Sequence, residues 1–424
     1  MPESSLDSRA ERLRRQVSDL RSIAPEEPLD DLEALRDIIG DARVVGLGEG
    51  AHFIEEFWSV RQRLVRFLHE RLGFDIVAAE FDLAEGEDLA RWLVDPTDTR
   101  PLREVSRGAA DWGMASTSQW LRSWSATLEE PPRFVGLDAP NGGAAVAATL
   151  SSVGAYLREV DPHAAPVLEQ IGAIVSHLAG SSGARTAAAW STLTQAEQDA
   201  LTAGLARLRR RVDALEPLIL ERSGEAQFRR ARQQIDALAV ADYALRVNAA
   251  MQRGEEALLD HSVRDRFMAD SVLALLAREP AARVVILAHN AHVQKQPVVW
   301  GDHLSAYPMG LYLQRTLGDD YRVVGTTTTG GRTSEMQLAP ETEVGFRVAE
   351  AKLDVPEPNS IEAGLLAAGL GDRTSLIALR AAAEAGFTFD RIRAQSGYLT
   401  TDVAAAYDAI VSLPSLTIDR NLGF

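Results

Sequence analysis

Side chains that can transfer protons follow four apolar runs of this sequence. In the stretch RVVGLGEGAHFIEEFW, Arg43 to Trp58, Glu49 precedes His52 by three residues. The other such residues end three further runs and are Glu80, Asp82, Asp138, His289 and His292. In such a set one histidine can take a proton from water, a glutamate can orient it, and a second histidine or an arginine can stabilise an oxyanion. The pattern therefore predicts acid/base chemistry, and no GxSxG elbow indicates a serine nucleophile.

Ordinary structural roles also explain some of these residues. Glu49 and His52 could form a turn stabilised by a hydrogen bond from side chain to backbone. Glu80 could pair with Arg61 of the preceding helix, and Asp138 could cap the turn that follows it. Two histidines directly after the buried run VVILA are harder to explain unless they contact a ligand or each other.

A metal site is a further interpretation of the histidines. His52, His289 and His292, with one carboxylate, have the ligand types of a zinc or iron site. No HExxH pattern supports such a site, and activation of water without a metal needs fewer groups. We therefore predict a site with no metal and no cofactor.

Hydrophobic periodicity predicts the elements that position these residues. Apolar runs indicate buried strands, and helical spacing indicates helices at 8–22, 29–39 and 55–72, the last stopped by Gly73. A strand–helix–strand unit makes its strands parallel neighbours in one sheet, and ligands bind beyond the carboxyl ends of such strands. The sequence therefore predicts an α/β fold with a mostly parallel sheet flanked by helices.

The long segment 144–277 has almost no strand signal and is rich in Ala, Leu, Arg and Gln. It is predicted to be a helical insertion that caps the cleft, with residues 179–186 as an exposed loop. The α/β core is then formed in two parts, from residues 1–143 and 278–424.

Composition excludes several classes of protein. A net charge of -17 argues against nucleic acid and against an anionic membrane surface as partners. The absence of cysteine excludes disulfides, thiolate metal sites and a cysteine nucleophile. The stretch MPESSLDSRAERLRRQ has no apolar h-region and no later segment approaches 18 continuous apolar residues, so we expect neither a signal peptide nor a membrane-spanning segment. We expect a cytoplasmic protein that acts on a small molecule, and composition does not indicate its oligomeric state.

Several motifs together resemble the erythromycin esterase family. Its opening motif reads approximately Gly-Glu-Ala/Ser-Thr-His-Gly-x-x-Glu-Phe, with an arginine nine residues beyond the histidine. The matching residues here are Gly48, Glu49, His52, Glu56, Phe57 and Arg61. Similar segments follow in the family's order over about residues 30–410: the acidic strand end at Glu80, GLDAP with Asp138, RDRFMADS (Arg264 to Ser271), AHNAHVQK, and MGLYLQRTLGDDYRVVGTTTTGG.

The resemblance implies an enzyme that hydrolyses ester bonds, notably macrolide lactones, without a metal. It implies that His52 is the general base, that Glu49 orients it, and that His289 lies opposite as acid or oxyanion partner. The remaining polar groups implied around the substrate are Arg61, Glu80, Asp138 and His292.

Two departures from the motif argue for a different substrate. Ala51 replaces the motif threonine and Phe53 the glycine after the histidine, so we expect the Phe53 ring to reshape the pocket. A lyase or cyclase that uses the same His/Glu pair on a natural-product intermediate is one alternative. A haem-binding or other ligand-binding protein with exposed axial histidines is another.

Overall fold

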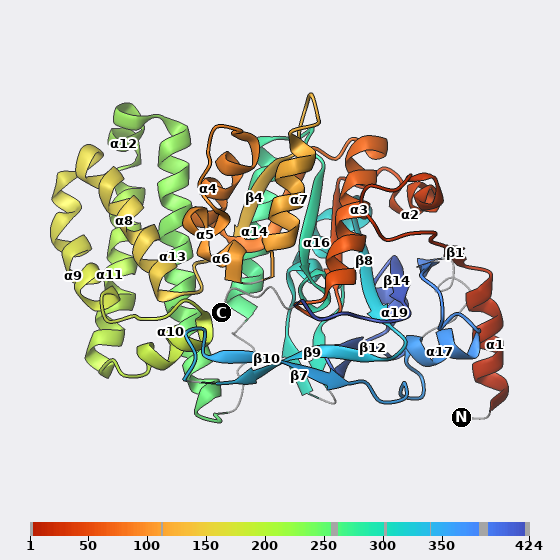
Figure 1. Cartoon of the computed structure of the whole chain (residues 1–424). Helices are drawn as coiled ribbons and strands as arrows, with labels where there is room; N and C mark the ends of the chain where they lie inside the picture. The colour runs from red at the N-terminus through yellow and green to blue at the C-terminus, as the bar shows by residue number, and fades with distance from the viewer. Residues whose placement is uncertain are drawn as a thin grey trace.

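An eight-stranded sheet with the order β1-β11-β14-β8-β2-β5-β3-β4 forms the centre of the protein (Figure 1). The computed structural model describes residues 3–111, 113–255, 262–300, 303–339, 341–380 and 389–419. In chain order the strands are β1 (Val17–Asp19), β2 (Val44–Glu49), β3 (Ile76–Asp82), β4 (Arg133–Asp138), β5 (Val284–His289), β8 (Tyr321–Thr328), β11 (Ser375–Ala378) and β14 (Ala409–Leu413). All neighbours from β14 to β4 are parallel, whereas β11 and β1 pair antiparallel. The predicted α/β fold with a mostly parallel sheet is confirmed.

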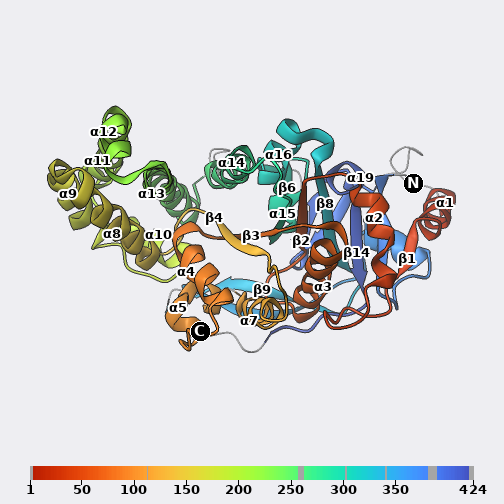
Figure 2. The same cartoon turned by 90° about the horizontal axis from the view of Figure 1, so that it is seen from above.

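Both faces of the sheet are covered by helices because successive strand side chains point to opposite sides. Val45, Leu47 and Val77 pack on one face against α2 (Ala34–Ile39), α3 (Glu55–Leu72), α4 (Leu83–Val94) and α7 (Ala115–Ser125). Val44 and Ile76 pack on the other face against α14 (Val263–Arg278), α15 (Asn290–Val293) and α16 (Met309–Leu317). Figure 2 shows the two helical layers with the sheet between them. The core elements therefore form three layers.

A bundle of helices lies beside the β4 edge of the sheet (Figures 1 and 2). Its helices are α8 (Gly143–Val160), α9 (Ala165–Val175), α10 (Gly183–Trp190), α11 (Gln195–Ala214), α12 (Glu216–Ser223) and α13 (Glu225–Gln252). Their apolar faces form a hydrophobic cluster of their own, whereas α14 packs into the cluster of the sheet. The division of the chain into a core and a cap at residues 144–277 stays a prediction.

Smaller elements surround the sheet. The strands β6 (Val298–Trp300), β7 (His303–Ala306), β12 (Arg391–Ala394) and β13 (Gly397–Thr400) form a second sheet. The strands β9 (Arg332–Leu338) and β10 (Phe346–Lys352) form a hairpin that reaches from the core toward α10 (Figure 1). The other helices are α1 (Glu3–Arg14), α5 (Leu102–Val105), α6 (Arg107–Asp111), α17 (Ile361–Ala367) and α19 (Val403–Ala406).

Three local predictions differ from the structure. The helix predicted at residues 8–22 ends at Arg14, because Val17–Asp19 pairs with the distant strand β11. The loop predicted at 179–186 is shorter and partly covered, because residues 183–186 belong to α10 and Ser182, which caps that helix, is 1% exposed. The helix predicted at 29–39 is a short 3-10 turn followed by α2.

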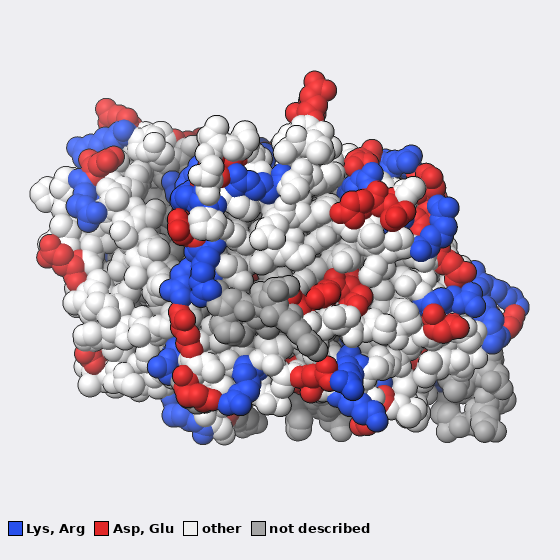
Figure 3. All heavy atoms as spheres, viewed as in Figure 1, with Lys and Arg blue, Asp and Glu red and all other residues white. Residues whose placement is uncertain are grey.

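Charged side chains of both signs are interspersed around the rim of the face seen in Figure 3. White, uncharged residues form much of the rest of this face, and a group of acidic side chains lies near its middle. In the part of the chain that the structure describes, no helix is long and apolar enough to cross a membrane. The exclusion of nucleic acid stays a prediction from net charge.

Candidate active site

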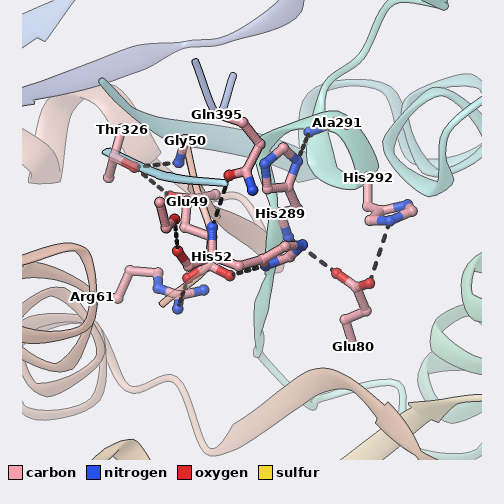
Figure 4. A network of polar contacts seen from close by, with 12 residues as sticks. Glu49, Gly50, His52, Arg61, Glu80, His289, Ala291, His292, Thr326 and Gln395 are labelled. Carbon is pink, nitrogen blue, oxygen red and sulfur yellow. Dashed lines mark hydrogen bonds and ion pairs between the residues drawn. The ribbon is translucent and has the colours of Figure 1, made fainter. Parts of the chain in front are cut away.

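The polar strand ends named above lie at one edge of the sheet. Parallel register places Glu49 of β2 opposite His289 of β5, and Asp82 of β3 opposite Asp138 of β4. Figure 4 shows the side chains of Glu49, His52, His289, Glu80 and His292 converging from neighbouring elements. Four strand ends therefore supply one polar floor.

His52 is held by an ionised carboxylate and keeps one ring nitrogen available. Its Nδ1 lies 2.8 Å from Oε1 of Glu49, and Arg61 of α3 donates from Nη2 to the other oxygen of that carboxylate. Burial alone would raise the pKa of Glu49, but the Arg61 guanidinium and the bond from His52 lower it below its ordinary value. An ionised Glu49 can accept the proton of Nδ1, and in that neutral tautomer Nε2 of His52 carries the lone pair.

The backbone of His52 is fixed as firmly as its ring. Its amide donates to Oε1 of Gln395 at 3.0 Å, and its carbonyl accepts a hydrogen bond from Oγ of Ser334. About a third of the side chain, 32%, remains exposed toward the cleft. One contact to the ring and two to the backbone therefore position the imidazole, which is still accessible to a substrate.

His289 faces His52 as a neutral ring. The ring centroids are 4.8 Å apart, and Nδ1 of His289 accepts a hydrogen bond from the amide of Ala291 at 3.1 Å. Burial, together with the neighbouring His52, lowers the pKa of His289 to about 3. Because Nδ1 accepts, the proton of the neutral ring is on Nε2, which has no partner among the described residues. His289 thus offers an N–H donor beside His52.

A second network occupies the other side of the floor. Arg264 of α14 donates to Oδ2 of Asp138 at 2.7 Å and to Oε1 of Glu80 at 2.8 Å. His292 lies with Nδ1 2.7 Å from Oδ1 of Asp265 and Nε2 3.3 Å from Oε1 of Glu80. Burial alone would lower the pKa of His292, but these two carboxylates raise it to about 9. The ring is therefore an imidazolium at neutral pH.

A cleft of about 320 Å³ is lined by His52, Glu80 and His292, whereas His289 is not among its lining residues. Trp58 and Met336 form part of its wall near His52, and Ala144, Ala145 and Ser181 contribute from the segment predicted to be the cap. Asp82 also lines it, with Oδ1 accepting from the amide of Glu85 at 2.6 Å. Burial raises the pKa of Asp82 to about 7, so this carboxyl group in the cleft titrates near neutral pH.

Comparison with known proteins identifies the family. The erythromycin esterase family model matches residues 69–416. The chain belongs to the erythromycin esterase family. It is 31% identical over 399 residues to erythromycin esterase type II of Escherichia coli, covering 93% of this chain and 95% of that protein. It is 29% identical to erythromycin esterase type I of Escherichia coli, covering 93% and 96% of the two chains.

Solved structures agree with this assignment. A mutant of the erythromycin esterase EreC in its open conformation superposes with a TM-score of 0.88 at 27% identity, over 95% of this chain and 98% of that one. As a member of the erythromycin esterase family, the chain is an erythromycin esterase-like hydrolase.

Phe53 differs from the family motif, and its ring does not line the cleft. It has φ +58°, a left-handed conformation that costs a non-glycine residue about 1–2 kcal/mol and explains the glycine of the erythromycin esterase motif. The ring is 1% exposed and packs with Trp58, Val344 and Phe346. Burial of a phenylalanine stabilises by about 1.5–3 kcal/mol, which offsets the strain. Phe53 is therefore not among the residues that line the cleft, and its predicted effect on the pocket stays a prediction.

The ion pairs differ from those expected, because the partners come from distant segments. Arg61 pairs with Glu49, whereas Glu80 pairs with Arg264, which lies 184 residues away in the sequence. Asp138 also binds the amide of Ala139, so its turn-stabilising role and its place in the network coexist.

Sequence reasoning missed several residues that support the candidate site. The adjacent pair Arg264 and Asp265, within RDRFMADS, was recognised as part of the family pattern but not assigned to the site. A charged pair at the start of an amphipathic helix was the available signal. Ser334 and Gln395 carry no comparable signal, because their hydrogen bonds to the backbone of His52 depend on tertiary packing alone.

The histidine nitrogens are mostly occupied by protein partners. His52 uses Nδ1 for Glu49, His289 uses Nδ1 for Ala291, and His292 has carboxylates at both nitrogens. Among the described residues, no three His, Asp or Glu side chains are grouped to hold a metal ion. The metal-free interpretation stays a prediction.

Proposed function

We propose that this enzyme hydrolyses an ester or lactone without a metal, with His52 as the general base. The observation that carries the proposal is the arrangement of Glu49, His52 and His289. With Nδ1 donating to Glu49, a neutral His52 has a lone pair on Nε2, and the His289 ring lies 4.8 Å away, centroid to centroid, with a buried Nε2 that has no partner among the described residues. A base beside a hydrogen-bond donor is what acyl transfer to water requires.

His52 would remove a proton from the attacking water at Nε2. The water oxygen forms a bond to the carbonyl carbon, and Glu49 stabilises the imidazolium that results. When the tetrahedral intermediate collapses, the bond to the alkoxy oxygen breaks and His52 returns its proton to that oxygen. The products are a carboxylic acid and an alcohol, which in a lactone remain in one molecule.

His289 would stabilise the oxyanion. With a pKa of about 3 it is neutral at working pH, so it donates from Nε2 without transferring the proton. This favours the oxyanion role over the general-acid role that the sequence left open. In a buried position such a donor is worth more than in water.

The second network would supply fixed charges near the substrate rather than transfer a proton to it. Arg264 and the His292 imidazolium are held by Glu80, Asp138 and Asp265, so their charges persist across neutral pH. We propose that Arg61, Glu80, Asp138 and His292 orient the substrate indirectly through this fixed charge pattern.

Macrolide lactones are the first substrates to test, because the curated relatives are erythromycin esterases. Mass spectrometry of erythromycin incubated with wild type and with His52→Ala tests the proposal. We expect a gain of one water with the wild type alone. A product that has lost water would instead indicate elimination. Activity that survives extensive chelation would support the metal-free mechanism, and its loss would contradict it.

A further inference from the structure

The hairpin formed by β9 and β10 has one apolar side that packs on Phe53 and Trp58, and Met336 on this side also lines the cleft. Met336 and Val348 are opposite each other in the hairpin register, and Phe346 is two residues before Val348. Side chains two apart on a strand point to the same face. Together with Val344 they pack around the rings of Phe53 and Trp58. The hairpin is therefore seated on the residue that directly follows the proposed base.

The same hairpin is bonded to the backbone of the proposed base. Ser334, two residues before Met336, donates from Oγ to the carbonyl of His52. The Phe53 ring lies 6.3 Å from the Phe346 ring, centroid to centroid. An added side chain on Gly113 would meet that ring at 3.2 Å, so Phe53 is enclosed from the α6–α7 loop as well. Phe53 is thus wedged between the hairpin and the wall of the cleft.

The far end of the hairpin is attached to the loop before α10. Oγ of Ser182 donates to the carbonyl of Val344 at 2.5 Å, and Oγ of Ser181 donates to the carbonyl of Glu343 at 3.2 Å. The Glu343 carboxylate also pairs with Arg107. Figure 1 shows β10 reaching α10 while β9 extends back toward the core. The hairpin therefore spans the cleft from the His52 turn to the helical bundle.

We propose that the β9–β10 hairpin selects substrates by size. Phe53 holds the hairpin in place by packing against it, and the Met336 side chain narrows the cleft. Met336 lines the cleft together with His52 and Trp58. With the hairpin seated, the cleft volume of about 320 Å³ is at the lower end of ligand pockets, which span roughly 300–1,000 Å³. The inference rests on the proposed function and deepens it: compact esters or lactones should be hydrolysed with a higher kcat/KM than a macrolide such as erythromycin.

A substrate series tests the role of Met336. Phenyl acetate and 1-naphthyl acetate share an acyl group and differ in the width of the alcohol, and erythromycin is wider still. Met336→Ala is expected to raise the ratio of kcat/KM for 1-naphthyl over phenyl acetate about tenfold, the scale of steric discrimination in an apolar pocket. Leu338→Ala is the matched control, because Leu338 is on the same strand but 73% exposed.

The outcomes of this series separate the two proposals. An unchanged ratio in Met336→Ala, with active enzyme, would overturn the size-selecting role. A wild type that hydrolyses none of the three esters would instead contradict the proposed function.

Hydrogen exchange tests, without any substrate, whether packing against Phe53 holds the hairpin in place. Phe53→Gly removes the ring and suits the left-handed backbone, so the fold should persist, as a cooperative unfolding transition would verify. Amides of β9, β10 and residues 181–186 should exchange about tenfold faster than in wild type, because the hairpin loses its apolar seat. Leu338→Ala should leave these rates unchanged. If the amides of Phe53→Gly exchange at the wild-type rate, Phe53 does not hold the hairpin in place.

Discussion

The two sides of the cleft floor contain the same residue types, but they differ in whether a histidine side chain can still exchange a proton with a substrate. On one side Arg61, Glu49 and His52 form a chain that ends at an imidazole with a lone pair. On the other side Arg264 joins two carboxylates, and His292 contacts a carboxylate at each ring nitrogen. On the first side an imidazole can exchange a proton with a substrate, whereas on the second side both ring nitrogens of the imidazole already contact carboxylates.

Charge state follows from the number of carboxylates around each ring. His289 and His292 are three residues apart, yet burial dominates at His289 and two carboxylates dominate at His292. One ring is therefore neutral and the other charged at the same pH. We infer that catalysis belongs to the side with an incomplete network.

The largest effect is expected from His52→Ala. Loss of a general base costs up to about 10⁴-fold in kcat, while the melting temperature should stay close to that of wild type because the side chain is partly exposed. Steady-state kinetics and thermal unfolding of the same preparation measure both. If His292→Gln, made in parallel, lowers kcat more than His52→Ala does, the assignment of the two sides is reversed.

A smaller loss is expected from His289→Ala. Removing one oxyanion donor typically lowers kcat by about 10²–10³-fold, and KM should change much less because the donor acts in the transition state. His289→Gln keeps an N–H donor and should recover part of the activity. Equal losses in both variants would argue that the ring has only a packing role.

Opposite effects of pH on stability are expected from the two neighbouring histidines. For His292, the folded pKa of about 9 is above the unfolded value of 6.5, so its stabilisation is complete below pH 6.5 and is lost as pH rises to 9. For His289, the folded pKa of about 3 is below 6.5, so its stabilisation is complete above pH 6.5 and is lost as pH falls to 3.

Urea unfolding across pH measures these contributions. The His292 contribution is up to about 3 kcal/mol, since one pKa unit corresponds to about 1.4 kcal/mol. Between pH 6.5 and 9, His292→Gln should flatten the fall in unfolding free energy, and His289→Gln should not. An identical slope in wild type and His292→Gln would show that His292 is not the buried imidazolium.

The smallest effect is expected from Arg61→Met. Without the guanidinium, burial dominates at Glu49 and its pKa rises, so a larger fraction of the carboxyl group is protonated and cannot accept Nδ1–H of His52. We expect kcat/KM to fall about tenfold at neutral pH and its acid limb to move to higher pH. A pH profile that keeps its wild-type midpoint would mean that Arg61 acts only in packing.

Much of the core could be predicted because its signals are local. Apolar runs followed by Glu49, Glu80, Asp138 and His289 indicated parallel strands, and a common sheet edge then brought these residues together. The helix at 8–22 failed at Val17 because pairing with β11 overrides helical propensity there. Such pairing depends on a partner more than 350 residues away, which no local window contains.

By itself the sequence determined the α/β core, the strand ends that carry acid and base, and the membership of His52 and Glu49 in one motif. Only the tertiary structure decided which arginine neutralises which carboxylate, which of His289 and His292 is charged, and that the Phe53 ring packs under a hairpin. The physical reason is the separation along the sequence over which each effect acts. Periodicity and turn chemistry act over a few residues, whereas pKa values and side-chain partners depend on groups that folding brings together from distant parts of the chain.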